Sequence, residues 1–101
     1  MTRIAAYVPD LMDRSKVAAA GGDDVTFVGS PGELAAAAAE VVVVDLSRPG
    51  VLEALPDLGG ARTIGFASHV DRELAAAATV AGCGEVLPRS RFFSSLPDLL
   101  A

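Results

Sequence analysis

The chain is poor in the residues that build disulfide-stapled or metal-bound proteins. Its 101 residues include one cysteine, one histidine and no tryptophan. A lone cysteine cannot form an intrachain disulfide, and neither it nor the single histidine has partners for a metal cluster. The residues that follow Met1 contain no apolar secretory stretch or small-residue cleavage site. We therefore expect a cytoplasmic protein in a reducing compartment, without a bound metal.

Positive charge is also scarce. Eight lysines and arginines face 13 aspartates and glutamates, which gives a net charge of −5 and a pI near 4.6. Such a chain repels nucleic-acid phosphates, so we expect no nucleic-acid binding. Glu40 and Asp45 interrupt the apolar middle of the chain well before the ~20 residues that a membrane span needs. The composition therefore predicts no membrane interaction.

Five apolar, β-branched runs of strand length recur along the chain. They cover residues 3–8, 24–28, 40–46, 62–67 and 85–87. The run of four valines that starts at Val41 does not alternate polar with apolar residues, which is typical of a parallel strand covered on both faces.

Segments of helical composition separate these runs. They cover residues 11–20, 33–39, 49–55, 71–82 and 92–100. Gly21 and Gly22 can close the first helix, Ser30 and Pro31 can begin the second, and Pro56 should stop the third. Asp71 can cap the fourth helix, which closes at Gly82 or Gly84. Pro97 makes the last helix irregular.

Parallel strands need right-handed crossover helices, so this alternation predicts a three-layer α/β fold, a (βα)5 doubly wound parallel sheet. Residues 1–101 should form one domain. Ligands of such sheets bind beyond the carboxyl ends of the strands. Any site should therefore involve residues 8–10, 45–49, 67–69 and 88–91.

Three segments, 41–50, 63–71 and 81–92, resemble the third, fourth and fifth strand regions of the receiver domains of bacterial response regulators. The first reads VVVVDLSRPG, a hydrophobic strand that ends in an aspartate and leads to Pro-Gly. The resemblance implies a flavodoxin-like fold with strand order 2-1-3-4-5 and a role in two-component signal transduction. It also implies that Asp45 stands at the phosphoacceptor position.

The chain departs from the receiver pattern at several positions that receivers use for phosphoryl transfer. Two carboxylates that hold a divalent cation normally end the first strand, and here Val8 and Pro9 stand in their places. The hydroxyl residue that ends the fourth strand is replaced by Ala67, with Ser68 next to it but pointing elsewhere. Arg89 takes the place of the receiver lysine. We expect Arg89 to pair with Asp45 in a locked site.

The remaining acids near the first helix have a simple structural interpretation. We expect Asp10 and Asp13 to cap this helix and favour its positive end. As an alternative, Asp10 swings in as a single magnesium ligand. We expect Cys83 to be a small packed residue of the core.

The leading hypothesis is a degenerate receiver-like module that is not an enzyme, needs no cofactor and binds a protein partner or itself. One alternative is a weakly active receiver that is phosphorylated on Asp45 with Mg²⁺; another is a flavodoxin-like domain that binds a small ligand. The expected interface lies within residues 71–101 and includes Arg89, Arg91, Phe92 and Phe93, which combine cations with aromatic rings. At least one of the two phenylalanines should instead attach the last helix to the sheet.

Overall fold

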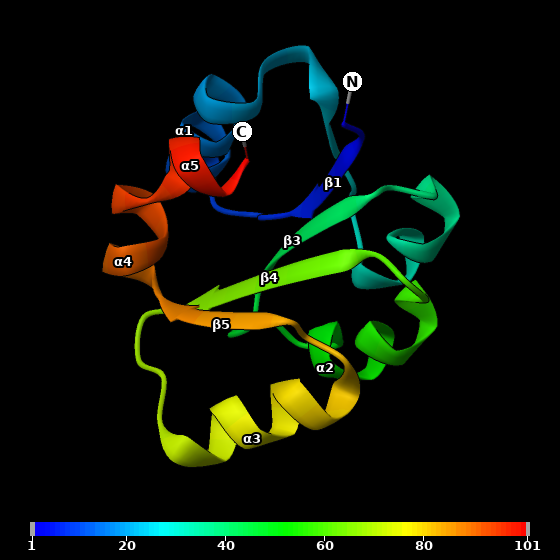
Figure 1. Cartoon of the computed structure of the whole chain (residues 1–101), viewed down its shortest axis with the longest axis vertical. Coiled ribbons are helices and arrows are strands. Elements are labelled where there is room, and N and C mark those ends of the chain that lie inside the picture. The colour runs from blue at the N-terminus through cyan, green and yellow to red at the C-terminus, as the bar shows by residue number, and fades with distance from the viewer. Residues whose placement is uncertain (1, 101) are drawn as a thin grey trace.

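The computed structural model describes residues 2–100, and its centre is a sheet of five parallel strands in the order β2-β1-β3-β4-β5 (Figure 1). The strands are β1 (Ile4–Tyr7), β2 (Val25–Phe27), β3 (Val41–Asp45), β4 (Arg62–Ala67) and β5 (Glu85–Pro88). This order and the parallel pairing confirm the predicted doubly wound sheet. Each strand also lies within two residues of its predicted bounds.

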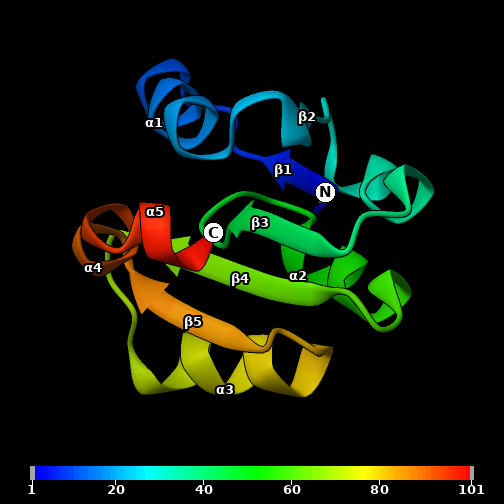
Figure 2. The ribbon, with the colours of Figure 1, turned by 45° about the horizontal axis from the view of Figure 1, so that its top comes forward.

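Helices cover both faces of the sheet. The helices are α1 (Leu11–Gly21), α2 (Val51–Ala54), α3 (Arg72–Ala81), α4 (Arg89–Ser94) and α5 (Leu96–Leu99). In Figures 1 and 2, α1, α4 and α5 lie on one side of the sheet, and α2 and α3 lie on the other. The chain therefore has the three layers that the alternation predicts.

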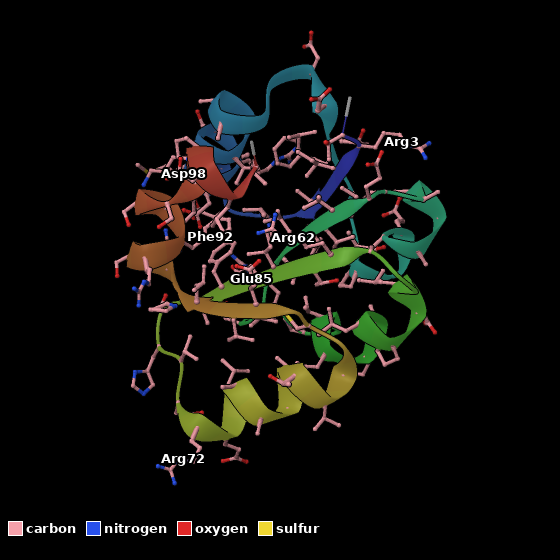
Figure 3. The ribbon with its side chains drawn as sticks, viewed as in Figure 1. Arg3, Arg62, Arg72, Glu85, Phe92 and Asp98 are labelled. Carbon is pink, nitrogen blue, oxygen red and sulfur yellow. The ribbon has the colours of Figure 1, made fainter. Side chains whose placement is uncertain are left out.

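Each face of the sheet has its own hydrophobic core. On the side of α1 and α4, the ring of Phe92 is fully buried and stacks on Phe66 with centroids 4.5 Å apart. Figure 3 shows Phe92 pointing inward from α4. Cys83 is buried in the core on the other side, as expected, and burial raises the pKa of its thiol.

The helix ends follow the predicted local chemistry. The Asp71 carboxylate accepts a hydrogen bond of 2.8 Å from the Leu74 N–H, so Asp71 caps α3. Gly22 and Gly82 close α1 and α3 with positive φ angles of 59° and 113°. Glycine adopts this backbone without steric cost.

Two predicted helices, 33–39 and 92–100, are wrong in detail. The last helical segment begins earlier, at Arg89, and is divided at Ser95 into α4 and α5. Residues 33–39 were expected to be a helix, but the chain forms two 3-10 turns, Pro31–Glu33 and Ala35–Ala37, and Ala38 ends them in the left-handed region. Between the two turns, Leu34 is buried in the core on the side of α2 and α3, and its packing takes precedence over the helix propensity of the alanines.

The α-helical part of the third segment does end before Pro56, as predicted, because α2 ends at Ala54 and Pro56 lies in a 3-10 helix at Leu55–Leu58. Proline has no backbone N–H, but the first turn of a helix leaves this group without a partner in the helix. Pro56 therefore fits the first turn of the 3-10 helix.

No helix within residues 2–100 has the length and apolar character needed to cross a membrane.

Candidate functional site at the carboxyl edge of the sheet

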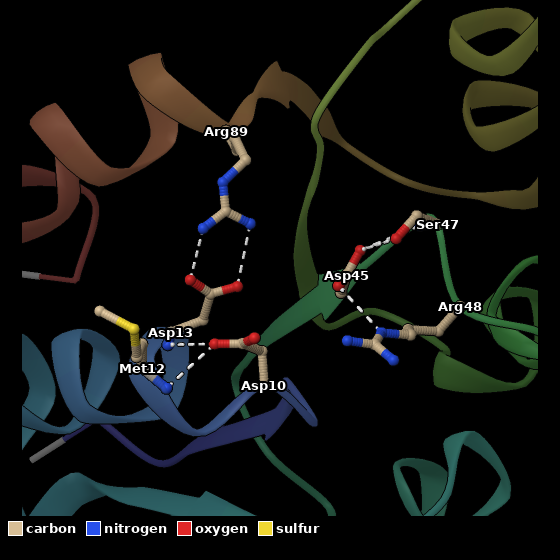
Figure 4. Close-up of polar contacts among 7 residues, drawn as sticks. All are labelled: Asp10, Met12, Asp13, Asp45, Ser47, Arg48 and Arg89. Carbon is tan, nitrogen blue, oxygen red and sulfur yellow. Dashed lines mark hydrogen bonds and ion pairs between the residues drawn. The ribbon is translucent and has the colours of Figure 1, made fainter.

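The carboxyl ends of the parallel strands bring together side chains from three distant parts of the chain (Figure 4). Asp45 ends β3, Asp10 and Asp13 belong to the beginning of α1, and Arg89 begins α4 directly after β5. The topology brings these groups to one edge because all five strands run in the same direction.

Asp45 is buried, and its carboxylate is held by its own loop. Its Oδ1 accepts hydrogen bonds from the Ser47 hydroxyl at 2.6 Å and from the Ser47 N–H at 3.0 Å. The Nε of Arg48 donates to Oδ2 at 3.3 Å, an ion pair in which Arg48 remains 40% exposed. Both oxygens of Asp45 are therefore bound by residues two and three positions farther along the chain.

The predicted pair between Arg89 and Asp45 is wrong, because Arg89 binds Asp13 instead. The two terminal nitrogens of Arg89 donate to the two carboxylate oxygens of Asp13, at 2.9 and 2.5 Å. Asp13 is only 3% exposed, so a bidentate partner offsets the cost of burying its charge. These hydrogen bonds raise the pKa of Arg89 further above its already high ordinary value.

Asp10 caps α1, as predicted, whereas Asp13 does not. The Asp10 Oδ1 accepts hydrogen bonds from the N–H groups of Met12 and Asp13 at 2.9 and 3.0 Å. The hydrogen bond from the Asp13 N–H contributes most to holding the pKa of Asp10 below its ordinary value. The carboxylate of Asp10 is therefore committed to the helix terminus.

The residues at this edge do not fit a magnesium ion. Magnesium needs an octahedral shell of oxygen ligands. After β1 the chain offers Val8, which is buried in the core, and Pro9. Within residues 2–100, no group of three His, Cys, Asp or Glu side chains is arranged to hold a metal. Each nearby aspartate already binds amides, a hydroxyl or a guanidinium.

The structure separates the other predicted site residues. Ala67 is buried at the end of β4, and Ser68 is exposed beyond it. Phe92 belongs to the core, which confirms that at least one phenylalanine attaches the last helix to the sheet. Phe93 is half-buried, and Arg91 is exposed. Of the four predicted interface residues, Arg91, Phe93 and part of Arg89 therefore remain accessible to a partner.

Asp13, Ser47 and Arg48 are the site residues that the sequence analysis missed. One signal for Asp13 was available, because it lies four residues before Val17 and therefore on the same, buried side of α1. An acid on that side requires a cation from another element. Arg48 lies three residues after Asp45 in a turn, where such a pair is within reach, but the sequence does not show which of two arginines Asp45 binds.

No protein-family model and no curated protein matches the chain. The comparison with solved structures does find chains of similar fold. The BeF3-activated receiver domain of DrrB matches with a TM-score of 0.84 and 18% identity, over 99% of this chain and 94% of that one. A response regulator from Thermotoga maritima matches with a TM-score of 0.79 and 14% identity, over 99% and 95% of the two chains. The response regulator domain of Thermotoga maritima CheB matches with a TM-score of 0.76 and 17% identity, over 99% and 91%.

These matches cover nearly the whole chain at low identity, and the sheet has the same strand order that the resemblance implies. The chain therefore has the CheY-like, flavodoxin-like fold of response-regulator receiver domains.

Proposed function

We propose that this chain is a degenerate receiver-like signalling module, which acts through protein contacts and carries out no phosphoryl transfer of its own. Its partner is a protein of a signalling pathway. A cytoplasmic location, which the sequence composition favours, belongs to the same proposal.

The observation that carries the proposal is the engagement of Asp45. Hydrogen bonds and an ion pair make a carboxylate a weaker nucleophile, and both oxygens of Asp45 are held in this way by Ser47 and Arg48. Arg48 already neutralises the Asp45 charge that a divalent cation would otherwise balance.

The chemistry at the rest of the edge supports the same conclusion. Transfer of a phosphoryl group depends on positioning and on cations that neutralise the developing charge. Val8 and Pro9 supply no oxygen ligand, Asp10 caps α1, and Arg89 is bound to Asp13. Ala67 has no hydroxyl with which to hold a phosphoryl oxygen.

The test is incubation of the protein with acetyl phosphate and magnesium, followed by measurement of the intact mass. We expect no added phosphoryl group, in wild type or in Asp45→Asn. A receiver of known activity, treated in parallel, shows that the donor is competent. An added phosphoryl group in wild type that Asp45→Asn loses would contradict the proposal.

That contrary result would establish the second candidate, a weakly active receiver. One observation favours it: Asp45 ends β3 at the carboxyl edge of the sheet, the place that the resemblance gives to the phosphoacceptor. Phosphorylation would then require Ser47 and Arg48 to release the carboxylate. Arg48 is the more readily displaced, because its contact is long and partly exposed.

A further inference from the structure

We propose that a hollow at the amino ends of β1 and β2 binds a small α-amino acid with an apolar side chain. This inference goes beyond the proposed function and does not depend on it, because the hollow lies at the end of the sheet opposite to Asp45. A ligand bound there gives the module a small-molecule input that is separate from phosphorylation.

The hollow has a volume of about 270 Å³ and lies between the sheet and the 3-10 turn Ala35–Ala37. Its apolar wall includes Ala5 of β1, which is fully buried, and Ala37 and Ala39 of the connection to β3. These residues present only methyl groups, so the space between them stays open. The volume is several times the ~30 Å³ of a water molecule and therefore suits a small organic molecule.

Opposite charges stand at the rim of the hollow. Arg3 comes directly before β1, Asp23 and Asp24 come directly before β2, and all three line the hollow. Ile4 lies opposite Val25 in the parallel register, so Arg3 and Asp24 lie at the beginnings of neighbouring strands, whose backbones are about 4.8 Å apart. Figure 3 shows the Arg3 side chain pointing outward from the beginning of β1.

These charges do not neutralise one another. The ion pairs that the structure shows within residues 2–100 all involve other residues, so Arg3, Asp23 and Asp24 form no ion pair with one another or with another described residue. Asp24 is half-buried, and Thr26, which also lines the hollow, adds a hydroxyl beside it on β2. The rim thus offers a guanidinium for an anion and two carboxylates for a cation.

An α-amino acid carries both of the complementary charges on neighbouring atoms. Its carboxylate is assigned to Arg3, because a guanidinium binds both oxygens of a carboxylate in its planar fork. Its ammonium is assigned to Asp23 and Asp24, with the Thr26 hydroxyl as a further acceptor. Its side chain then lies against the alanines, where an apolar group is favoured. A simple amine or a simple carboxylic acid would use only one half of the rim.

The probe is L-leucine, titrated into isotope-labelled protein and followed by amide chemical shifts. Two analogues separate the charges: leucinamide keeps the ammonium without the carboxylate, and isocaproate keeps the carboxylate without the ammonium. We expect saturable changes at Ala5, Thr26 and Ala37 with leucine at about millimolar concentration. Each analogue should bind about tenfold more weakly or worse, because it leaves one side of the rim unpaired.

Two variants test the assignment of each charge. Arg3→Gln should bind leucine no more tightly than wild type binds leucinamide, and should bind leucinamide like wild type. Asp23→Asn combined with Asp24→Asn should lose the preference for leucine over isocaproate in the same way. Damage to the fold would instead weaken the binding of all three ligands, so the pattern distinguishes recognition from stability.

Matched controls remove the same charges from distant surfaces. Arg91→Gln changes an exposed arginine of α4, and Glu73→Gln combined with Asp98→Asn changes exposed acids of α3 and α5. Both controls should bind leucine like wild type. Circular dichroism shows that all variants are folded.

Three results would overturn the proposal: no saturable change at about ten times the expected concentration of leucine, an analogue that binds as tightly as leucine, or shift changes centred on the carboxyl edge around Asp45. Failure of the proposed function is a separate result, because it appears as phosphorylated Asp45 in the mass experiment and leaves the leucine titration unchanged.

Discussion

Three aspartates, Asp10, Asp13 and Asp45, lie at the same edge of the sheet and have three different sets of partners. Asp10 is exposed and caps a helix, Asp13 is buried against a guanidinium, and Asp45 is bound by its own turn. The chemistry of a carboxylate is set by what surrounds it, so equal residue types here have unequal roles. Each of the three has at least one oxygen bound to these partners.

The pair between Arg89 and Asp13 gives a prediction at this scale. Arg89→Met should lower the free energy of unfolding by about 2 kcal/mol, because it leaves a buried carboxylate without a partner. The cost is below that of a fully buried pair because Arg89 is 37% exposed. Urea denaturation measures the change.

The double variant Asp13→Leu with Arg89→Met should recover most of that loss, since replacing both partners by apolar residues removes the unpaired charge. Glu85→Gln is the control. It removes an exposed ion pair with Arg62, visible in Figure 3, and should cost about 0.5 kcal/mol. A single variant as stable as wild type would contradict the role assigned to Arg89.

At the scale of elements, the connection between β2 and β3 differs most from its prediction. Its alanines favour a helix, but the chain forms two 3-10 turns and reverses at Ala38, whose φ is 50°. Leu34, which is buried, attaches this connection to the sheet. The packing of one leucine and the need to reach β3 override the helix propensity of the alanines.

The backbone at Ala38 yields the second prediction. A residue with a Cβ in the left-handed region costs about 1 kcal/mol that glycine avoids. Ala38→Gly should therefore raise the free energy of unfolding by about 0.5 to 1 kcal/mol in urea denaturation. Ala36→Gly, an exposed alanine within the second 3-10 turn, should lower it by a similar amount. Two changes of the same sign would show that the strain at Ala38 is not released by glycine.

At the scale of the whole molecule, the fold and its usual chemistry are separable. The sheet and its strand order match the fold of receiver domains over nearly the full chain. The fold depends on apolar strands and crossover helices, whereas phosphoryl transfer depends on a few side chains at one edge. Side chains at that edge can therefore change while the fold stays the same.

The third prediction uses the stability of the whole molecule. A ligand that binds only the folded state raises the melting temperature as its concentration increases. Because Val8 and Pro9 supply no side-chain oxygen and the nearby aspartates are bound to other groups, we expect the melting temperature to be the same in millimolar MgCl2 and in KCl of equal ionic strength. A rise that depends on magnesium concentration and is absent with potassium would show that a site exists.

The sequence by itself determined the class of fold. Apolar runs of strand length, glycine and aspartate at helix ends, and the covered valines of β3 depend on neighbours close in the chain, so local physical chemistry is sufficient to read them. The same local chemistry identified Asp10 and Asp71 as helix caps. The sequence also shows directly that positions 8 and 9 carry valine and proline instead of carboxylates.

Only the tertiary structure decided which charges meet. Asp13 and Arg89 are 76 positions apart, and two arginines, Arg48 and Arg89, were candidates for the partner of Asp45. The pairing of Asp13 with Arg89 depends on how α1 and α4 pack against one side of the sheet, because this packing sets the distance between the two side chains. Local pattern does not encode such distances. The same packing buries the ring of Phe92 and leaves Phe93 half-buried.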